Sequence, residues 1–136
     1  MAENIRLEVV TPEKSVVSED AKIVMAPGSL GEFGVLSGHT PFLTTLKMGA
    51  IRYTDTKGQE RFVFVSGGFA EALPDKVTVL AESAERRKSI DLERAKAAME
   101  RAQQRLDKSS EDIDFIRAKA ALERALHRVR LAGTRR

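Results

Sequence analysis

The chain of 136 residues contains no cysteine, no tryptophan and only two histidines. Without cysteine it has no disulfide, no thiolate nucleophile and no cysteine-containing zinc site, which is typical of a reducing compartment. Its histidines, His39 and His127, are too few for a typical histidine metal site and lie in different segments. The sequence therefore predicts no metal site and no required cofactor.

Long apolar runs are also missing. No segment approaches the ~18 apolar residues of a membrane-spanning helix. Residues 1–10 lack the apolar core of a secretory signal. We therefore expect a soluble chain that stays in the cytoplasm.

Basic residues are concentrated at one end of the chain. In total there are 23 Lys and Arg against 20 Asp and Glu, a formal net charge of +3. Residues 1–81 hold 8 basic and 10 acidic residues, which gives −2, and residues 82–136 hold the other 15 and 10, which gives +5. A basic excess can indicate a nucleic-acid partner, and any such partner would bind the tail.

Residues 1–86 have the pattern of a small all-β domain. Ile5, Leu7 and Val9 alternate with charged residues, the period of two that a half-buried strand shows. Further candidate strands lie at 22–25, 33–36, 42–46, 50–54, 61–65 and 77–80. Turn-forming residues such as Pro27-Gly28 separate them, and the spacing leaves no room for crossover helices. The sequence predicts an antiparallel sandwich or flattened barrel.

Residues 87–136 are predicted to form an antiparallel helical hairpin. Apolar residues recur there at spacings of 3 and 4, the pattern of amphipathic helices. They are Leu92, Ala95, Met99, Ala102 and Leu106 in the first helix, and Phe115, Ala118, Leu122, Ala125 and Val129 in the second. Ser89 is predicted to cap the first helix and Ser109-Ser110-Glu111-Asp112 the second. Both stripes are narrow and rich in alanine, so the seam between the helices should contribute only roughly a few kcal/mol.

Catalytic motifs are hard to find in the sequence. The glycines of Gly28-x-x-Gly31-x-x-Gly34 lack the Lys-Ser/Thr ending of a phosphate-binding loop, so they are interpreted as turn residues. A Ser-His-Asp triad built on Ser37 and His39 is an alternative, but no nucleophile elbow surrounds these residues. The prediction is a protein that binds partners and is not itself an enzyme.

Arginines flank the apolar stripe of each predicted helix. They are Arg94, Arg101 and Arg105 in the first helix, and Arg117, Arg124 and Arg128 in the second. The flanking positions are rotated by about 100° from the stripe. If the helices pack as a hairpin, four arginines should converge over one cleft suited to phosphate oxygens: Arg94, Arg101, Arg124 and Arg128. An ordinary solvated face is the alternative, since charged stripes beside a seam are common in helical hairpins.

Four motifs between residues 9 and 80 resemble one protein family, and the resemblance extends over essentially the whole chain. They are Val9-Val10-Thr11-Pro12, the segment 31–41 (GEFGVLSGHTP), Val65-Ser66-Gly67-Gly68-Phe69 and the segment 75–80 (DKVTVL). Together they are similar to the ε subunit of the bacterial rotary F-type ATP synthase. The resemblance implies an N-terminal β-sandwich followed by a C-terminal helical hairpin, which agrees with the fold predicted from periodicity.

The resemblance implies a non-catalytic subunit of the central stalk of the rotor. Its β domain would bind the γ subunit and the membrane-embedded c-ring, with Glu32, Gly34 and His39 as contact residues. Its hairpin would reach the catalytic β subunits of the α and β ring and restrain ATP hydrolysis, while rotation is coupled to proton or sodium flow. Such a subunit is peripheral to the membrane, and we expect it at the cytoplasmic face of a bacterial plasma membrane.

Some members of this family bind ATP in the folded hairpin, through a motif of Ile or Leu, Asp, two variable residues, Arg and Ala. The segment 90–95 (IDLERA) matches this motif. The ligand positions implied by the resemblance are Glu85, Ile90, Asp91, Arg94, Arg101, Arg124 and Arg128. ATP would then be a regulatory ligand that stabilises the folded hairpin.

A stand-alone basic module that binds nucleic acid through the hairpin is the alternative function. It would need aromatic side chains on which bases can stack. The tail has one aromatic residue, Phe115, which is predicted to lie on the apolar stripe. The sequence therefore favours the stalk subunit, with no nucleic-acid partner.

Overall fold

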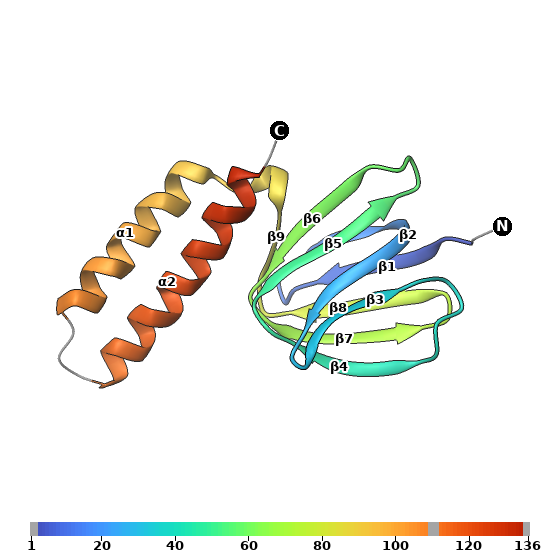
Figure 1. Cartoon of the computed structure of the whole chain (residues 1–136), viewed down its shortest axis with the longest axis horizontal. Coiled ribbons are helices and arrows are strands. Elements are labelled where there is room, and N and C mark those ends of the chain that lie inside the picture. The colour runs from blue at the N-terminus through green and yellow to red at the C-terminus, as the bar shows by residue number, and fades with distance from the viewer. Residues whose placement is uncertain (1–2, 109–111, 135–136) are drawn as a thin grey trace. The chain divides into compact units, whose positions relative to one another are not determined.

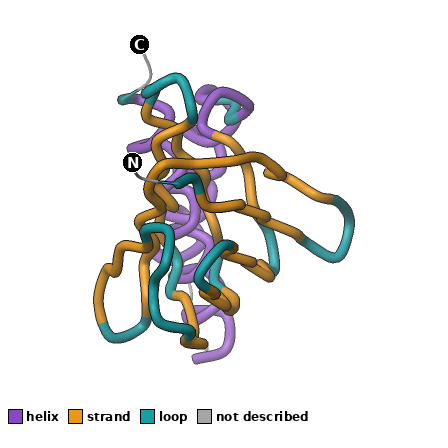
Figure 2. Tube along the Cα trace, turned by 90° about the vertical axis from the view of Figure 1, so that its right-hand side faces the viewer, coloured by secondary structure: helices purple, strands orange, loops and turns teal. Residues whose placement is uncertain are grey.

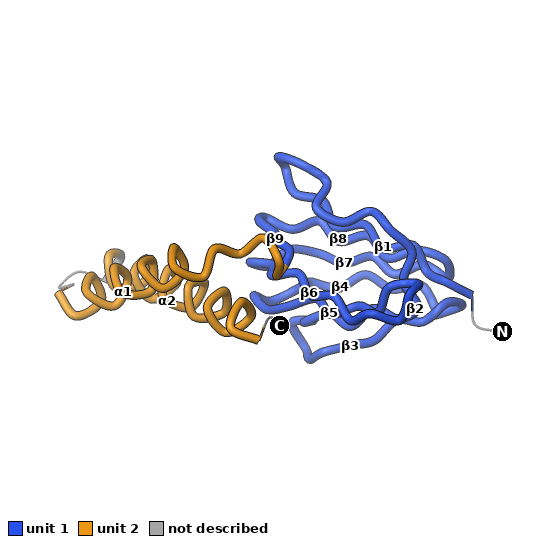
Figure 3. Tube along the Cα trace, turned by 90° about the horizontal axis from the view of Figure 1, so that it is seen from above, with its two compact units in different colours: residues 1–86 blue, residues 87–136 orange. Residues whose placement is uncertain are grey.

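The computed structural model describes residues 3–108 and 112–134. The chain forms two compact units, residues 1–86 and residues 87–136, coloured separately in Figure 3. Strands build the first unit, called the sandwich below, and helices build the second, called the hairpin.

The sandwich consists of strands joined by short loops, drawn orange and teal in Figure 2. They are β1 (Ile5–Val10), β2 (Ser15–Gly28), β3 (Gly31–Val35), β4 (Phe42–Leu46), β5 (Gly49–Asp55), β6 (Glu60–Val65), β7 (Gly68–Leu73), β8 (Lys76–Ala81) and β9 (Ala84–Arg86). In β5 every second residue is buried, because successive side chains of a strand point to opposite faces of the sheet. The inward faces of the strands enclose one core.

These strands form a flattened barrel around that core (Figure 1). Hydrogen bonds link them in the order β1-β8-β7-β4-β2-β5-β6-β9, and both β1 and β3 pair with β2. The long strand β2 closes the structure, since its first part pairs with β1 and its later part with β3 and β5. The predicted sandwich or flattened barrel is confirmed.

One strand pair departs from the antiparallel expectation. β1 and β8 run parallel, from Arg6 opposite Lys76 to Val10 opposite Leu80. The other pairings between described strands are antiparallel. Short loops rule out parallel pairing only for strands that follow one another. All of β2 to β7 lies between β1 and β8, so the chain has ample length to return in the same direction.

Parts of the sheet were not predicted, namely β7, β9 and the first part of β2. Their inward-facing residues are small or few, so the apolar alternation that indicates a strand is weak. In β7 the buried residues are Ala70 and Ala72, and the large Phe69 points outward and is 53% exposed. Sequence reasoning therefore found the strands with Val, Ile or Leu on the inner face and missed those with alanine.

The core of the sandwich is made of branched aliphatic side chains. Those that are fully excluded from solvent include Ile5, Leu7, Val9, Val24, Val35, Ile51, Val63, Val65, Val77 and Val79. Burying one such side chain contributes about 1.5–3 kcal/mol to folding. The sandwich therefore has the interior of an independently stable domain.

Gly68 allows β7 to approach β8 closely. Its φ is 145°, which residues with a side chain rarely adopt. A Cβ atom at this position would overlap the carbonyl oxygen of Leu80 and lie 2.9 Å from the Cα of Ala81. The glycine in this motif is thus explained by the packing of two neighbouring strands.

The hairpin comprises a short 3-10 helix, η1 (Arg87–Ser89), and two helices, α1 (Leu92–Lys108) and α2 (Asp112–Gly133) (Figure 1). Its seam consists of buried alanines: Ala95, Ala102, Ala118, Ala125 and Ala132. The predicted thin seam is therefore present. Phe115, predicted to be part of it, is 46% exposed, because a seam one alanine wide leaves a large ring beside it uncovered.

Over its described residues, neither helix is long and apolar enough to cross a membrane.

Asp91 caps α1, and the prediction of Ser89 is wrong. A carboxylate oxygen of Asp91 accepts a hydrogen bond of 3.1 Å from the backbone N–H of Arg94. Ser89 instead ends the 3-10 turn, in which the N–H of Ile90 bonds to the carbonyl of Arg87 at 3.2 Å. The extra turn moves the helix start by two residues. The cap predicted for the second helix falls mostly on residues 109–111, outside the described part of the chain.

Candidate functional site: a cationic cleft on the hairpin

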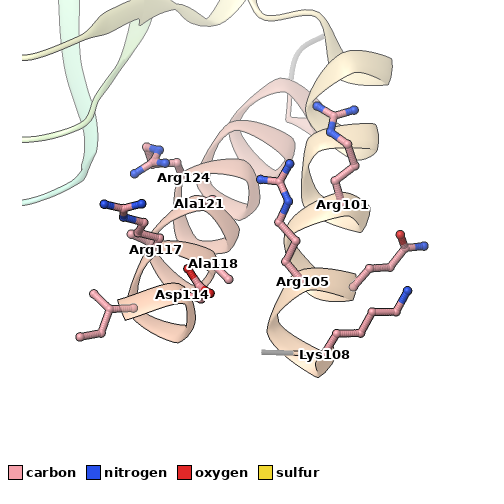
Figure 4. A pocket seen from close by; sticks show the side chains of 11 residues that line it. Arg101, Arg105, Lys108, Asp114, Arg117, Ala118, Ala121 and Arg124 are labelled. Atoms are coloured by element: carbon pink, nitrogen blue, oxygen red, sulfur yellow. The ribbon is translucent and has the colours of Figure 1, made fainter. Parts of the chain in front are cut away.

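A cleft on the hairpin gathers cationic side chains from both helices. It has a volume of about 900 Å³ and is open to solvent. Its lining residues are Arg101, Gln104, Arg105 and Lys108 from α1, and Asp114, Ile116, Arg117, Ala118, Ala120, Ala121 and Arg124 from α2. Figure 4 shows the arginines standing on two neighbouring helices, with alanines between those of α2. This set of residues is called the cationic cleft below.

The cationic cleft forms because its arginines lie one position before the seam. Arg101 precedes the buried Ala102, and Arg124 precedes the buried Ala125. One residue back along a helix is a rotation of about 100°. In an antiparallel pair this rotation carries both helices toward the same side of the seam. The cations of α1 and α2 therefore share one face of the hairpin.

The cationic cleft carries far more positive than negative charge. Of its lining side chains, Lys108 and four arginines are cationic, and Asp114 is the one carboxylate. Among the residues whose side chains are described, 3–108 and 114–134, none of these five cations forms an ion pair. The planar guanidinium group presents several donors that match phosphate and carboxylate oxygens. The arrangement therefore suits a multivalent anion.

The nucleotide motif lies at the start of α1. Asp91 is committed to the helix cap, with its carboxylate bonded to the Arg94 N–H, and Ile90 is 2% exposed. Arg94 is exposed at the first turn of the helix. The motif therefore fixes where α1 begins, and both Glu93 and Arg94 within it are exposed.

The structure brings two of the proposed nucleotide ligands into one cleft. Arg101 and Arg124 both line the cationic cleft. Arg94 lies two helical turns before Arg101, outside the lining, and Arg128 is half-buried and outside it as well. Glu85 belongs to the sandwich, where its backbone pairs with Phe64 between β9 and β6.

Sequence reasoning did not include three cations of the cleft in the candidate site. They are Arg105, Lys108 and Arg117. A signal for them was present, because Arg105 lies four residues after Arg101 and Arg117 seven residues before Arg124, and such spacings place residues on one helix face. Which members of each stripe the two helices bring together was not fixed by this spacing.

The residues proposed for the γ and c-ring contact lie in and after β3. Glu32 is exposed, and its carboxylate accepts a 3.5 Å bond from Arg52 on β5. Gly34 faces Met25 of β2, and a Cβ there would lie 2.7 Å from the Met25 sulfur. Glu32 is thus available to a partner, while Gly34 has a packing role within the sheet.

His39 is held by its own neighbours. Its Nδ1 lies 2.7 Å from the carbonyl oxygen of Thr40, and its ring packs edge-on against Phe42 at a centroid distance of 5.1 Å. Within the described residues no hydrogen bond joins Ser37 to His39. The geometry gives no support to a triad built on these two residues.

A buried polar cluster holds β9, the last strand of the sandwich. The Arg86 guanidinium donates to the carbonyl oxygen of Val16 and to the Tyr53 hydroxyl, both at 3.1 Å, and lies 3.7 Å from the Glu19 carboxylate. The Tyr53 hydroxyl in turn donates to Glu19. Burial, reinforced by this bond to Glu19, raises the pKa of Tyr53 to about 12. Tyr53 therefore stays neutral, and the chain is fixed to the sandwich up to Arg86.

Asp55 fixes the turn between β5 and β6. Its carboxylate accepts bonds of 2.9 Å from the backbone N–H groups of Lys57 and Gln59, and one of 3.1 Å from Arg61 Nε. The backbone bond from Gln59 and the contact with Arg61 lower the pKa of Asp55. These bonds account for the carboxylate as a structural group, without a ligand.

A β-barrel followed by a helical hairpin that carries a cationic cleft defines a protein of two parts. Family models match both parts: the β-sandwich domain of the ATP synthase delta/epsilon chain covers residues 4–87, and its long α-helix domain covers residues 88–133. The chain therefore belongs to the ATP synthase delta/epsilon chain family, and its relatives include proteins named ATP synthase epsilon chain.

Individual relatives agree with this placement. The ATP synthase epsilon chain of Desulfosudis oleivorans is 69% identical over 107 residues, which cover 79% of this chain and 80% of that protein. The epsilon chain of Nitratidesulfovibrio vulgaris is 53% identical over 133 residues, or 98% of each chain. Among solved structures, a chain of the Euglena gracilis mitochondrial ATP synthase, OSCP/F1/c-ring, matches with a TM-score of 0.76 and 25% identity, covering 88% of this chain and 76% of that one.

Proposed function

We propose that this chain is a non-catalytic subunit of the central stalk of a rotary F-type ATP synthase. The observation that carries this proposal is that the family match extends over both the sandwich and the hairpin, residues 4–133. The similar chain of known structure comes from an assembly of F1 with a c-ring. The partners are therefore the γ subunit, the c-ring and the α and β subunits, and the chain is peripheral to the membrane through the complex.

The sandwich is the part suited to permanent attachment. Its interior is filled by large aliphatic side chains, and Arg86 ties its last strand to β2 and β5. The turn between β2 and β3 exposes Leu30 completely, with Glu32 exposed beside it. This turn, with an exposed apolar residue next to an acidic one, fits a contact surface for the c-ring or γ. Gly34 and His39 would contribute by shaping β3 and the loop that follows it.

The hairpin is the part suited to regulation. Its seam of alanines buries little apolar area, so a ligand or partner with a modest preference for one arrangement shifts the balance between arrangements. ATP bound through Arg94, Arg101, Arg124 and Arg128 would favour the folded hairpin. The unliganded hairpin would restrain ATP hydrolysis through contacts of its cations with the β subunits.

Titration of the full chain with ATP tests the regulatory function. We expect saturable binding between micromolar and millimolar ATP that Arg94→Ala weakens at least tenfold. Lys96→Ala is the matched control, because it removes one exposed cation of α1 from the other side of the seam. If ATP does not bind at concentrations up to several millimolar, the regulatory function is wrong, while membership of the stalk is unaffected.

Copurification tests the attachment to the stalk. Expression with the other subunits should give stoichiometric recovery with γ and the α and β ring, insensitive to nuclease. Recovery with RNA or DNA alone, lost as salt is raised, would instead support the basic nucleic-acid module. The same preparation should associate with bacterial plasma membranes on the cytoplasmic face and be released with the complex.

A further inference from the structure

We propose that the cationic cleft binds polyphosphate chains as such, with Arg105 and Arg117 as ligands outside the nucleotide motif. The shared chemistry is a linear chain of phosphate groups, supplied either by a nucleoside triphosphate or by an inorganic tripolyphosphate or pyrophosphate. The cleft overlaps the proposed nucleotide site at Arg101 and Arg124 and to that extent rests on the proposed function. Binding of a polyphosphate chain there requires neither a nucleobase nor the motif at the start of α1.

The cations are distributed along the hairpin axis. Arg101 and Lys108 are seven residues apart on α1, and Arg117 and Arg124 are seven residues apart on α2, which corresponds to about 10 Å along each helix. Donors therefore line the cleft on both sides over this length. An elongated anion with charge on each unit can contact all of them, whereas a single phosphate would reach only some.

Small side chains lie between the arginines of α2 in the cationic cleft. Ala118 is buried and Ala121 is half-buried, and both lie between Arg117 and Arg124 on α2 (Figure 4). A phosphate chain can lie there in contact with several arginines. The one carboxylate of the lining, Asp114, stands near the start of α2 and leaves the excess of cations intact.

The cleft lies away from the motif that is proposed to hold the nucleoside. Arg94 is seven residues before Arg101, again about 10 Å along α1, and does not line the cleft. A ligand that occupies the region of Arg105 and Arg117 therefore interacts mainly through its phosphates. This separation predicts that a ligand without a nucleobase still binds the cleft with measurable affinity. It also predicts that substitutions near Arg94 and substitutions of Arg105 and Arg117 affect different ligands.

Calorimetric titration of the full chain with sodium tripolyphosphate, without divalent cations and at physiological salt, tests the proposal. We expect saturable binding that the double variant Arg105→Ala/Arg117→Ala weakens at least tenfold. The control Lys96→Ala/Lys119→Ala removes the same charge from residues that follow the seam alanines on the opposite side, and should change the affinity less than twofold. Alanine is the best helix former, so both variants should keep the helical circular dichroism.

Three results would overturn the proposal. The first is an equal loss in both double variants, because net charge alone would produce it. The second is no binding of tripolyphosphate while ATP binds and depends on Arg94, which leaves the proposed function standing. The third is a single-stranded oligonucleotide that binds more tightly than tripolyphosphate and is lost in the same variant, because the cleft would then hold a nucleic-acid backbone. Binding of tripolyphosphate without binding of ATP would support the polyphosphate site in the cleft and would show that the proposed regulation by ATP is wrong.

Discussion

The sandwich and the hairpin differ in what fills their interiors. The sandwich buries valine, isoleucine and leucine from most of its strands, whereas the residues buried in the described part of the hairpin are Ile90 and five alanines. Each buried methylene group contributes about 0.8 kcal/mol, so a seam of single methyl groups contributes little. The difference favours the sandwich as the anchor and the hairpin as the part proposed to respond to ligands.

The two units also differ in how their charges are used. Arginines of the sandwich are paired: Arg61 with Asp55, Arg86 with Glu19 and Arg52 with Glu32. The five cations of the cleft form no ion pair with residues 3–108 or 114–134. Paired charges fix a structure, whereas a row of unpaired cations is stabilised when an anion arrives. Packing and electrostatics therefore both favour the hairpin as the site of the proposed response to ligands.

The largest effect is expected from Gly68→Ala in the sandwich. The new Cβ would collide with the backbone of β8, and the φ of 145° is strained for alanine. We expect a loss of about 4 kcal/mol or more in the free energy of unfolding, measured by urea denaturation. Gly58→Ala is the control, since it shares a positive φ of 86° but has open space around it. It should cost about 1–2 kcal/mol, and equal effects would show that the collision is not the cause.

A smaller loss is expected from Leu7→Ala in the core. Leu7 is fully excluded from solvent, so truncation leaves a cavity and should cost about 3 kcal/mol of unfolding free energy. Leu80→Ala, on the neighbouring strand but 56% exposed, should cost less than about 1 kcal/mol. Similar losses in the Leu7→Ala and Leu80→Ala variants would mean that the core of the sandwich is not tightly packed.

Ala118→Leu tests the hairpin seam by overpacking. A larger side chain at this buried position should separate α1 from α2 and cost about 1–3 kcal/mol of hairpin stability. The loss of helical circular dichroism on heating should begin at lower temperature, while the transition of the sandwich stays where it was. Ala97→Leu, on the exposed face of α1, should leave both transitions unchanged. A shift of the sandwich transition by Ala118→Leu would contradict the independence of the two units.

The smallest effect concerns the titration of Tyr53. It is the one tyrosine in a chain without tryptophan, so its ultraviolet absorbance can be followed alone. The midpoint should lie near 12, and Glu19→Gln should lower it only partly, because burial is the larger cause of the raised pKa. Since the pKa is raised on folding, this contribution to stability is complete below about pH 10 and lost as pH rises toward 12. The control Asp20→Asn, at the residue after Glu19, should leave the titration midpoint of Tyr53 unchanged.

Much of the difference between the sandwich and the hairpin could be predicted from the sequence. The strands with aliphatic inner faces and the alanine seam follow from periodicity, because burial imposes a repeat of two or of three to four residues. The pairing of β1 with β8 could not be predicted, since it joins strands far apart in the chain. Nor could the cap at Asp91, which depends on a 3-10 turn whose residues carry no strong signal of their own.

The candidate site was predicted in part. The placement of Arg101 and Arg124 in one cleft agrees with the spacing of the flanking stripes. The other cations of the cleft required the structure, because a stripe on a single helix does not show which of its members the partner helix brings close. The proposed division between a nucleoside end and a phosphate end of the hairpin depends on that pairing.

Hydrogen exchange of the full chain, with and without saturating ATP, tests the central claim most directly. Amides in the middle of α1 and α2 should exchange much faster than those of β5, β7 and β8, because the seam stabilises the hairpin less than the core stabilises the sandwich. ATP should slow exchange in α1 and α2 and leave the strands unchanged. Helices as well protected as the strands, with no response to ATP, would contradict the account of an anchored sandwich and a ligand-dependent hairpin.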